Sequence, residues 1–146
     1  MKNLTIERTV NAPRSAVWAV LADYPNISAW NSGVHRSDAV GDATAGVGAV
    51  RVCELDGNVS MRETVTAWTD QQTMAIAIDD IQKMPVKEAA MTFSLADAGD
   101  ATTLTMSYDF APKGGPFAGL LAAMMTKPMN KGFNGFIDDL EVAAQG

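Results

Sequence analysis

The chain has very little of the chemistry on which metal centres and redox sites depend. It contains one cysteine, Cys53, and one histidine, His35, among 146 residues. A lone cysteine excludes an internal disulfide, and the usual zinc and copper sites need more cysteine or histidine ligands than this chain has. No acidic pattern resembles a calcium loop, and there is neither a P-loop nor a dinucleotide-binding glycine fingerprint. We therefore expect no metal and no cofactor.

Long apolar runs and basic clusters are also missing. The longest run of apolar or small residues, FAGLLAAMM at 117–125, is nine residues long, whereas a membrane-spanning helix needs about 20. Eleven basic residues against seventeen acidic ones give a formal charge of −6, with no Lys/Arg cluster along the sequence. Stable membrane insertion, an anionic membrane surface and nucleic acid are therefore not expected. The segment MKNLTIERTV lacks the apolar stretch of a secretory leader, and the lone cysteine favours a reducing compartment, so the predicted location is the cytoplasm.

What the sequence does contain predicts one α+β domain over residues 1–146. Residues 3–11 alternate between apolar and polar side chains, as a half-buried strand does. Pro13 is typical of a first helical turn, and the helix is expected to stop at Tyr24-Pro25 before a second short helix at about 26–30. Six further strands in antiparallel order are predicted at 34–40, 47–55, 58–69, 72–79, 87–97 and 101–111.

The last part of the chain predicts a long amphipathic helix after the KGGP segment. Its apolar residues recur every three or four positions, as expected for a helix that packs on a sheet. They are Leu121, Met125, Met129, Phe133, Phe136 and Leu140. Pro128 lies inside this segment, and we expect the helix to kink there because proline removes one backbone hydrogen bond.

Four segments in this order resemble the START-like, or SRPBCC, superfamily, and more narrowly its polyketide cyclase/dehydrase-like branch. They are NAPRSAVWAVLADYPNISAW, GDATAGVG, RETVTAWTD and GGPFAGLLAAMMTKPMNKGF. The resemblance implies a helix-grip fold, in which a curved antiparallel sheet of about seven strands has two short helices after its first strand. A long C-terminal helix then covers the sheet and encloses a cavity.

The resemblance implies a cavity more clearly than it implies a reaction. The superfamily includes lipid and sterol carriers, hormone, alkaloid and quinone binders, aromatic polyketide cyclases and chaperone-activating modules, and no catalytic signature extends across it. We expect binding of a hydrophobic or amphipathic small molecule such as a lipid, quinone, isoprenoid or aromatic polyketide, for transport, sequestration or sensing. The alternatives are a cyclase/dehydratase-type enzyme and a protein-interaction module. A monomer or a homodimer is expected.

The apolar faces of the sheet and of the last helix are expected to line this cavity. Methionine is prominent there, and its flexible side chain suits an irregular pocket, although it also fills ordinary cores. Tyr108 is the strongest polar candidate because it presents a hydroxyl on an apolar strand face, and Trp30 is expected near the mouth. The predicted ligand contacts are Trp30, Met61, Ile76, Met91, Phe93, Met106, Tyr108, Leu121, Met125, Phe133 and Phe136.

Three charged residues, Arg8, Glu54 and Glu63, alternate with apolar residues and so fall on inward strand faces. A buried charge must be paired, so an Arg8–glutamate pair in the cavity is one expectation. Such a pair would orient a polar ligand head or adjust a glutamate pKa for acid–base use. The alternative, in which all three reach solvent near strand ends or bulges, stays open. No catalytic residue is assigned, and Tyr108, Glu63 and Arg8 are the candidates if the protein is an enzyme.

The alternation of side chains predicts no chemical role for the one histidine and the one cysteine. His35 shares a face with Ser37 and Ala39, opposite the face that holds two valines, so it is expected to point outward. Cys53 lies between Val52 and Glu54, and we expect it to face outward as well. Neither residue is therefore predicted to be a nucleophile or a base.

Overall fold

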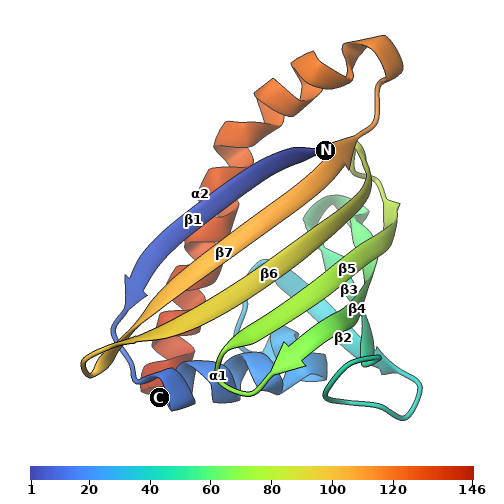
Figure 1. Cartoon of the computed structure of the whole chain (residues 1–146). Helices are drawn as coiled ribbons and strands as arrows, with labels where there is room; N and C mark the ends of the chain where they lie inside the picture. The colour runs from blue at the N-terminus through green and yellow to red at the C-terminus, as the bar shows by residue number, and fades with distance from the viewer.

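The computed structural model describes residues 1–146 as a curved antiparallel sheet with helices at one end and across one face (Figure 1). The strands are β1 (Lys2–Val10), β2 (Val34–Val40), β3 (Val50–Leu55), β4 (Ser60–Thr69), β5 (Thr73–Gln82), β6 (Val86–Ala98) and β7 (Ala101–Pro112). The α-helices are α1 (Arg14–Ala22) and α2 (Ala118–Gln145), and short 3-10 helices are η1 (Tyr24–Ala29), η2 (Asp56–Asn58) and η3 (Gly115–Phe117).

All seven strands belong to one sheet in the order β1-β7-β6-β5-β4-β3-β2. The first strand therefore lies beside the last one, while β2 to β7 form a continuous meander. Two register shifts in the β4–β5 pair, between Ser60 and Arg62 and between Val65 and Ala67, mark bulges. Bulges increase local twist and bend, which helps a sheet to curl around what covers its concave face.

Every predicted strand is present, and the differences lie at the ends. β3 begins at Val50 rather than at 47, because residues 41–49 form a loop in which Gly46 and Gly48 have positive φ. β4 begins at Ser60 rather than at 58, after the short helix η2. β5 continues to Gln82 rather than ending at 79. These ends are set by turn geometry, to which apolar alternation is insensitive.

Helices α1 and η1 close one end of the sheet. Pro13 stands at the N-cap of α1 in extended conformation, and the helix ends at Ala22, just before Asp23 and Tyr24. The buried side of α1 includes Trp18, whose ring meets Trp68 of β4 edge-on at 5.2 Å between centroids. An edge-to-face pair of this kind holds α1 against the sheet.

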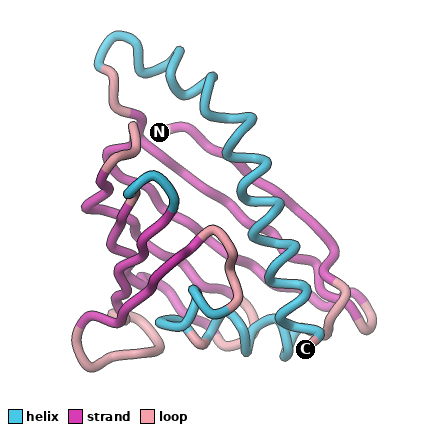
Figure 2. Tube along the Cα trace, turned by 180° about the vertical axis from the view of Figure 1, so that it is seen from behind, coloured by secondary structure: helices cyan, strands magenta, loops and turns pink.

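Helix α2 crosses the concave face of the sheet, as Figure 2 shows from the side opposite to Figure 1. Its second half is anchored by Ile137 and Leu140, which are fully buried. Both views show the axis changing direction part-way along, and we attribute the bend to Pro128, which lies inside the helix. The first turns extend past the ends of the neighbouring strands. Neither α2 nor any other helix is long and apolar enough to cross a membrane.

Candidate functional site

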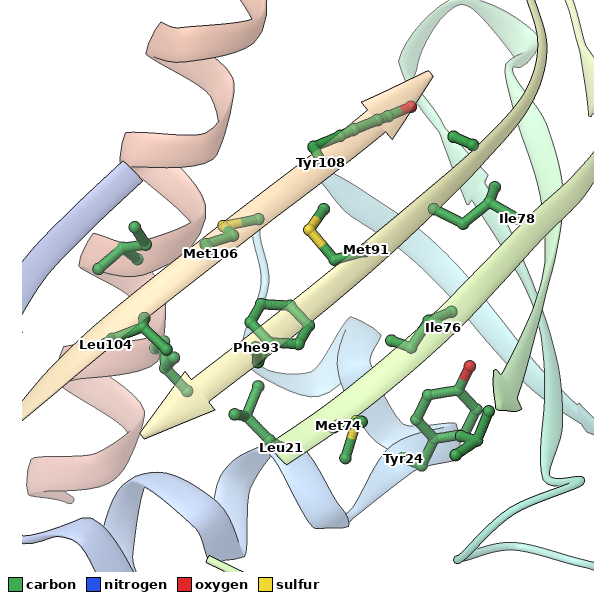
Figure 3. Close-up of a cluster of buried hydrophobic side chains, with 14 of the residues drawn as sticks. Leu21, Tyr24, Met74, Ile76, Ile78, Met91, Phe93, Leu104, Met106 and Tyr108 are labelled. Carbon is green, nitrogen blue, oxygen red and sulfur yellow. The ribbon is translucent and has the colours of Figure 1, made fainter. Parts of the chain in front are cut away.

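A cavity of about 460 Å³ lies between the concave face of the sheet and α2. Sixteen of the 23 residues that line it are hydrophobic. Figure 3 shows part of this wall together with the core beside it. Apolar side chains of β5, β6 and β7 and Tyr108 line the cavity, whereas Tyr24 lies in the neighbouring core. Pockets that bind small molecules have volumes of roughly 300–1,000 Å³ and apolar walls with a few polar groups. The volume and the lining are therefore those of a ligand site.

Nine of the eleven residues predicted as ligand contacts line the cavity. The sheet contributes side chains from four strands, and α2 contributes the rest. The nine are Met61, Ile76, Met91, Phe93, Met106, Tyr108, Met125, Phe133 and Phe136.

Leu121 and Trp30, the other two predicted contacts, are not among the residues that line the cavity. Leu121 lies beside the turn at Gly114, in the part of α2 that extends past the sheet. Trp30 packs behind the wall, with its ring edge-on to Phe136 at 5.1 Å. Its indole Nε1 is buried and has no hydrogen-bond partner. Trp30 therefore supports a lining residue, because Phe136 in turn stacks on Phe93 at 5.6 Å.

The polar part of the wall is an ion pair between β3 and β4. The Nε atom of Arg51 donates to Oε1 of Glu63 at 2.6 Å, and the two side chains are only 7% and 12% exposed. Arg51 also donates through Nη1 to the backbone oxygen of Tyr24 at 2.8 Å, and its guanidinium lies 3.9 Å from the centre of the Tyr24 ring. These contacts compensate for the removal of both charges from water.

The electrostatics of this cluster follow from burial. Burial lowers the pKa of Arg51, but the charge of Glu63, its hydrogen bond, and the smaller effects of Tyr24 and Cys53 together raise the pKa by more, so the guanidinium stays charged. Burial raises the pKa of Tyr108 to about 12, and the charge of Glu63 adds to the effect. Burial likewise raises the pKa of Tyr24, with Arg51 opposing the shift. Both phenols are therefore neutral hydrogen-bond donors near neutral pH.

The predicted orientation of β3 was wrong by one residue. Arg51 and Cys53 face the cavity, whereas Glu54, expected inside with Val50 and Val52, is exposed. Arg51 is the direct register partner of Glu63, so both side chains lie on the same face. A buried ion pair thus replaces the apolar residues that alternation would place inside.

Cys53, expected to face outward, is buried in the cavity wall. Its sulfur lies 3.6 Å from Oε1 of Glu63. Burial and the Glu63 charge raise the pKa of the thiol to about 12. A thiol that keeps its proton is a poor nucleophile, so Cys53 contributes volume and a weak donor to the wall.

Arg8 does not enter the cavity, and the predicted Arg8–glutamate pair does not form. Its Nη1 donates to the backbone oxygen of Asn134 at 3.0 Å, and its Nη2 donates to Asp138 Oδ1 at 2.7 Å. Arg8 therefore ties β1 to α2. The inward-facing glutamate, Glu63, is paired with Arg51 instead.

His35 points outward, as predicted. The side chain is exposed, and Nε2 contacts Oδ1 of Asp56 across the turn that follows β3. Its neighbours Gly33 and Val34 do line the cavity. The register shift between Val34 and Arg36 leaves His35 on the solvent side.

A second, more polar hollow adjoins the cavity between the turn at residues 31–33 and α2. It has a volume of about 380 Å³ and only one hydrophobic residue among nine. Five residues line both hollows: Asn31, Gly33, Pro128, Gly132 and Phe136. Shared lining makes the second hollow an outer vestibule of the first. Its rim is fixed where Ser32 donates through its backbone nitrogen and hydroxyl to Asp139 Oδ2.

Comparison with known proteins identifies the family. The family model described as polyketide cyclase/dehydrase and lipid transport matches residues 1–145. The chain belongs to this family. Among curated proteins, none matches the sequence significantly.

Solved structures confirm the helix-grip fold of this polyketide cyclase/dehydrase and lipid transport family member. TTHA0849 from Thermus thermophilus is similar with a TM-score of 0.81 and 17% identity over 99% of this chain and 97% of that one. The ZhuI aromatase/cyclase from Streptomyces sp. R1128 is similar with a TM-score of 0.81 and 16% identity, over 99% of this chain and 93% of that one. Ara h 8.0201 is similar with a TM-score of 0.78 and 14% identity, over 99% of this chain and 97% of that one. At these identities the likeness concerns the fold.

The main lining residues that sequence reasoning missed are polar or conformational. Arg51 was overlooked because it alternates with Val50 and Val52, and this pattern predicts that the arginine side chain faces solvent. Pro128 was interpreted only as the site of a kink and Gly132 was given no role, yet both line the two hollows. One signal was available in the sequence. Consecutive predicted strands contain one arginine and one glutamate, and if either charge were buried it would need the other as a partner.

Proposed function

We propose that this family member binds an amphipathic small molecule whose apolar body fills the cavity and whose polar group meets Arg51 and Tyr108. The observation that carries the proposal is a largely apolar cavity of about 460 Å³ with a buried ion pair in its wall. Of the nine lining residues named above, the eight other than Tyr108 are the proposed apolar contacts. The membership of a family described by polyketide chemistry and lipid transport supports the same class of ligand.

The size of the cavity argues that something occupies it. An enclosed dry void of 460 Å³ would destabilise the fold by about 11 kcal/mol at ~24 cal/mol per Å³, and this is an upper bound because the cavity opens into the outer hollow. That equals the entire stability of a typical domain, which is about 5–15 kcal/mol. Water fills such a space poorly, because each water needs two to four polar partners and the wall offers few. An apolar ligand satisfies the wall without that requirement.

Two hydrogen-bond donors in the wall are left without a protein partner. The Tyr108 hydroxyl makes no hydrogen bond within the protein, and Arg51 donates through Nε and Nη1 but not through Nη2. Both groups donate, so they favour a ligand oxygen such as a carbonyl, phenol or carboxylate. A quinone or an aromatic polyketide offers such oxygens on an apolar ring, and a fatty acid offers them at the end of a chain.

Native mass spectrometry of the purified protein tests the proposal, because a co-purified small molecule would be detected directly. In parallel, a fluorescent amphipathic naphthalene sulfonate is titrated against the wild type and against Met91→Trp, which fills the cavity from β6. Binding by the wild type and at least ~10-fold weaker binding by Met91→Trp are expected. Val142→Trp, on the exposed side of α2, is the control for added indole surface. Equal binding by all three proteins would contradict an internal site.

A cyclase or dehydratase activity is the second candidate, favoured by the presence of Arg51, Glu63 and Tyr108 in one cavity. Arg51 and Tyr108 would polarise a ketone oxygen, and Glu63 would accept a proton. Replacing a true acid or base lowers turnover by at least ~10²-fold. Tyr108→Phe and Glu63→Gln are therefore compared with His35→Ala in turnover of model polyketide substrates. Unchanged rates in the first two variants would remove these assignments.

Three features of the proposal rest on the sequence alone. Residues 1–146 as one domain, the cytoplasmic location and the monomeric or homodimeric state stay predictions. Light scattering of the purified protein tests the last of these.

A further inference from the structure

The first turns of α2 extend past the sheet (Figures 1 and 2). A stripe of large apolar side chains is exposed there, and it begins at Phe117, the N-cap residue of α2. Phe117, Leu120 and Met124 are 69%, 64% and 67% exposed, and they are three of the seven large apolar residues exposed in the molecule. Their spacing of three and four residues aligns them on one side of the helix, away from the cavity-lining Met125. A contiguous exposed apolar stripe marks an interaction surface.

Basic charge continues the same stripe. Lys127 and Lys131 follow Met124 at intervals of three and four residues, so the stripe changes from apolar to basic along α2. No acidic residue occurs between Asp109 and Asp138, whereas Lys113, Lys127 and Lys131 all fall in that interval. The rest of the chain is strongly acidic, since the whole molecule carries a formal charge of −6.

The fold gathers the remaining lysines at the same end. Lys2 opens β1 where β7 ends, since it pairs with Phe110. Lys83 lies in the turn between β5 and β6, and Lys87 is the second residue of β6. The turn is joined to the loop before α2, because the backbone nitrogen of Lys113 donates to the backbone oxygen of Pro85 at 2.9 Å. All six lysines are exposed and none forms an ion pair, whereas four of the five arginines do: Arg8, Arg14, Arg36 and Arg51.

Helix stability does not explain this arrangement. The helix dipole favours acidic residues near the N-terminus and basic residues near the C-terminus. α2 has no acidic residue in its first turn and no basic residue in its last, and its acids, Asp138, Asp139 and Glu141, lie in the second half. The unpaired lysines therefore point to a negatively charged partner outside the chain.

We propose that this end of the molecule docks on a bilayer that contains anionic phospholipid. Phe117, Leu120 and Met124 enter the interface between head groups and acyl chains, and Lys113, Lys127 and Lys131 contact the phosphates. Lys2, Lys83 and Lys87 have acidic neighbours at this end, among them Asp80, Glu88 and Asp109. The orientation is therefore set by Lys113 and the two lysines of α2, while the acids in the second half of α2 are repelled by the bilayer. Met84, Pro85, Met125 and Pro128 line the cavity from the β5–β6 turn and α2, so docking brings the cavity beside the lipid.

The docking proposal reverses the expectation drawn from the sequence, in which the absence of a basic cluster along the chain argued against an anionic membrane surface. The lysines are separated along the chain, and the fold brings them together. A second copy of the chain suits this surface less well than a bilayer does. A symmetric dimer through the stripe would place either lysine against lysine or the lysines of each copy against the apolar residues of the other, and both arrangements are unfavourable.

Flotation with phospholipid vesicles tests the proposal on the full chain. The wild type is expected to bind equimolar phosphatidylcholine–phosphatidylglycerol vesicles at least ~10-fold more tightly than phosphatidylcholine vesicles, and to be released by high salt. Lys127→Gln and Lys131→Gln should each weaken binding by roughly fivefold. Arg62→Gln, which removes an exposed unpaired charge on β4, should leave it unchanged. Equal binding to both vesicle types, or no binding to either, would overturn the proposal.

The apolar stripe has its own matched control. Phe117→Ser together with Leu120→Ser should abolish vesicle binding, whereas Val142→Ser, equally exposed at 69% near the other end of α2, should not. Light scattering without lipid distinguishes the competing occupant, since a wild-type dimer that Phe117→Ser dissociates would assign the stripe to a second copy and overturn the proposal. Docking does not depend on the cavity ligand. Met91→Trp should lose the probe and keep vesicle binding, so each proposal can fail alone.

Discussion

Arg51 and Glu63 face each other across neighbouring strands, with Nε and Oε1 2.6 Å apart in the wall of the cavity. The arginine also stacks on Tyr24, whose hydroxyl donates to the backbone oxygen of Glu63 at 2.9 Å. Three residues from η1, β3 and β4 are thereby tied together. The cluster fixes the cavity wall at β3 and β4, on the opposite side of the sheet from β1 and β7, which α2 contacts. It supplies the only paired charges in the wall.

Replacing one partner of this ion pair should lower the free energy of unfolding more than replacing both partners. Glu63→Leu leaves the Arg51 guanidinium buried without its partner, which costs about 3 kcal/mol, and Arg51→Met has a comparable effect. The double variant leaves no unpaired charge and should lie close to the wild type. Urea unfolding of the four proteins gives the coupling. Losses that simply add in the double variant would show that the pair is not held as a unit.

The stability of the protein should fall at high pH, and Cys53 should dominate the first part of the fall. Its pKa is raised from 9.0 to about 12, chiefly by burial. Above about pH 9 the unfolded chain loses this proton while the folded chain keeps it, so the unfolded state binds fewer protons and unfolding becomes easier. Between about pH 9 and pH 10 the loss should approach 1 kcal/mol.

Cys53→Ala is the comparison for this pH effect. The variant should show a flatter dependence of unfolding free energy on pH over that interval, whatever its stability at neutral pH. Tyr24 and Tyr108 act mainly above pH 10, their ordinary pKa, because burial raises both of theirs as well. Identical slopes for the wild type and Cys53→Ala between about pH 9 and pH 10 would contradict the burial of a protonated thiol.

Trp30 and His35 lie five residues apart and should differ strongly in their importance. Trp30→Ala removes the ring that packs edge-on against Phe136, and we expect it to lower the free energy of unfolding by roughly 2–4 kcal/mol. Trp30→Phe should cost less than about 1 kcal/mol, because the lost Nε1 has no partner. His35→Ala should change stability by less than about 0.5 kcal/mol and leave probe binding unchanged. A large loss of binding in the histidine variant would reverse this ranking.

The sequence predicted the architecture well because the signals for it are local and repeated. Alternation over β7 and the three- and four-residue spacing in α2 each involve many residues, so a single exception does not obscure them. The order of strands and helices then limits the topology, and the resemblance to the helix-grip family supplied the rest. Most of the cavity lining could then be predicted, because apolar side chains on the concave face of the sheet point into the space between the sheet and α2.

The polar wall could not be predicted in the same way. Alternation sorts side chains by polarity, so it places Val50 and Val52 inside and Arg51 outside, and only the partnership with Glu63 reverses that choice. Arg8 shows the converse, since its strand position faces inward but its long side chain reaches Asn134 and Asp138 at the edge. Pairing across the fold decides both cases, and no local pattern contains it.

Three glycines of α2 allow a test of the vestibule. A Cβ at Gly119, Gly132 or Gly135 would meet no atom within 4 Å, so each change to alanine should stabilise the helix by about 0.5–1 kcal/mol. Gly132 and Gly135 line the outer hollow, whereas Gly119 does not. If ligand enters through this hollow, Gly132→Ala and Gly135→Ala should slow association of the naphthalene sulfonate probe in stopped-flow measurements, while Gly119→Ala should not. Equal association rates in all three variants would place the route elsewhere.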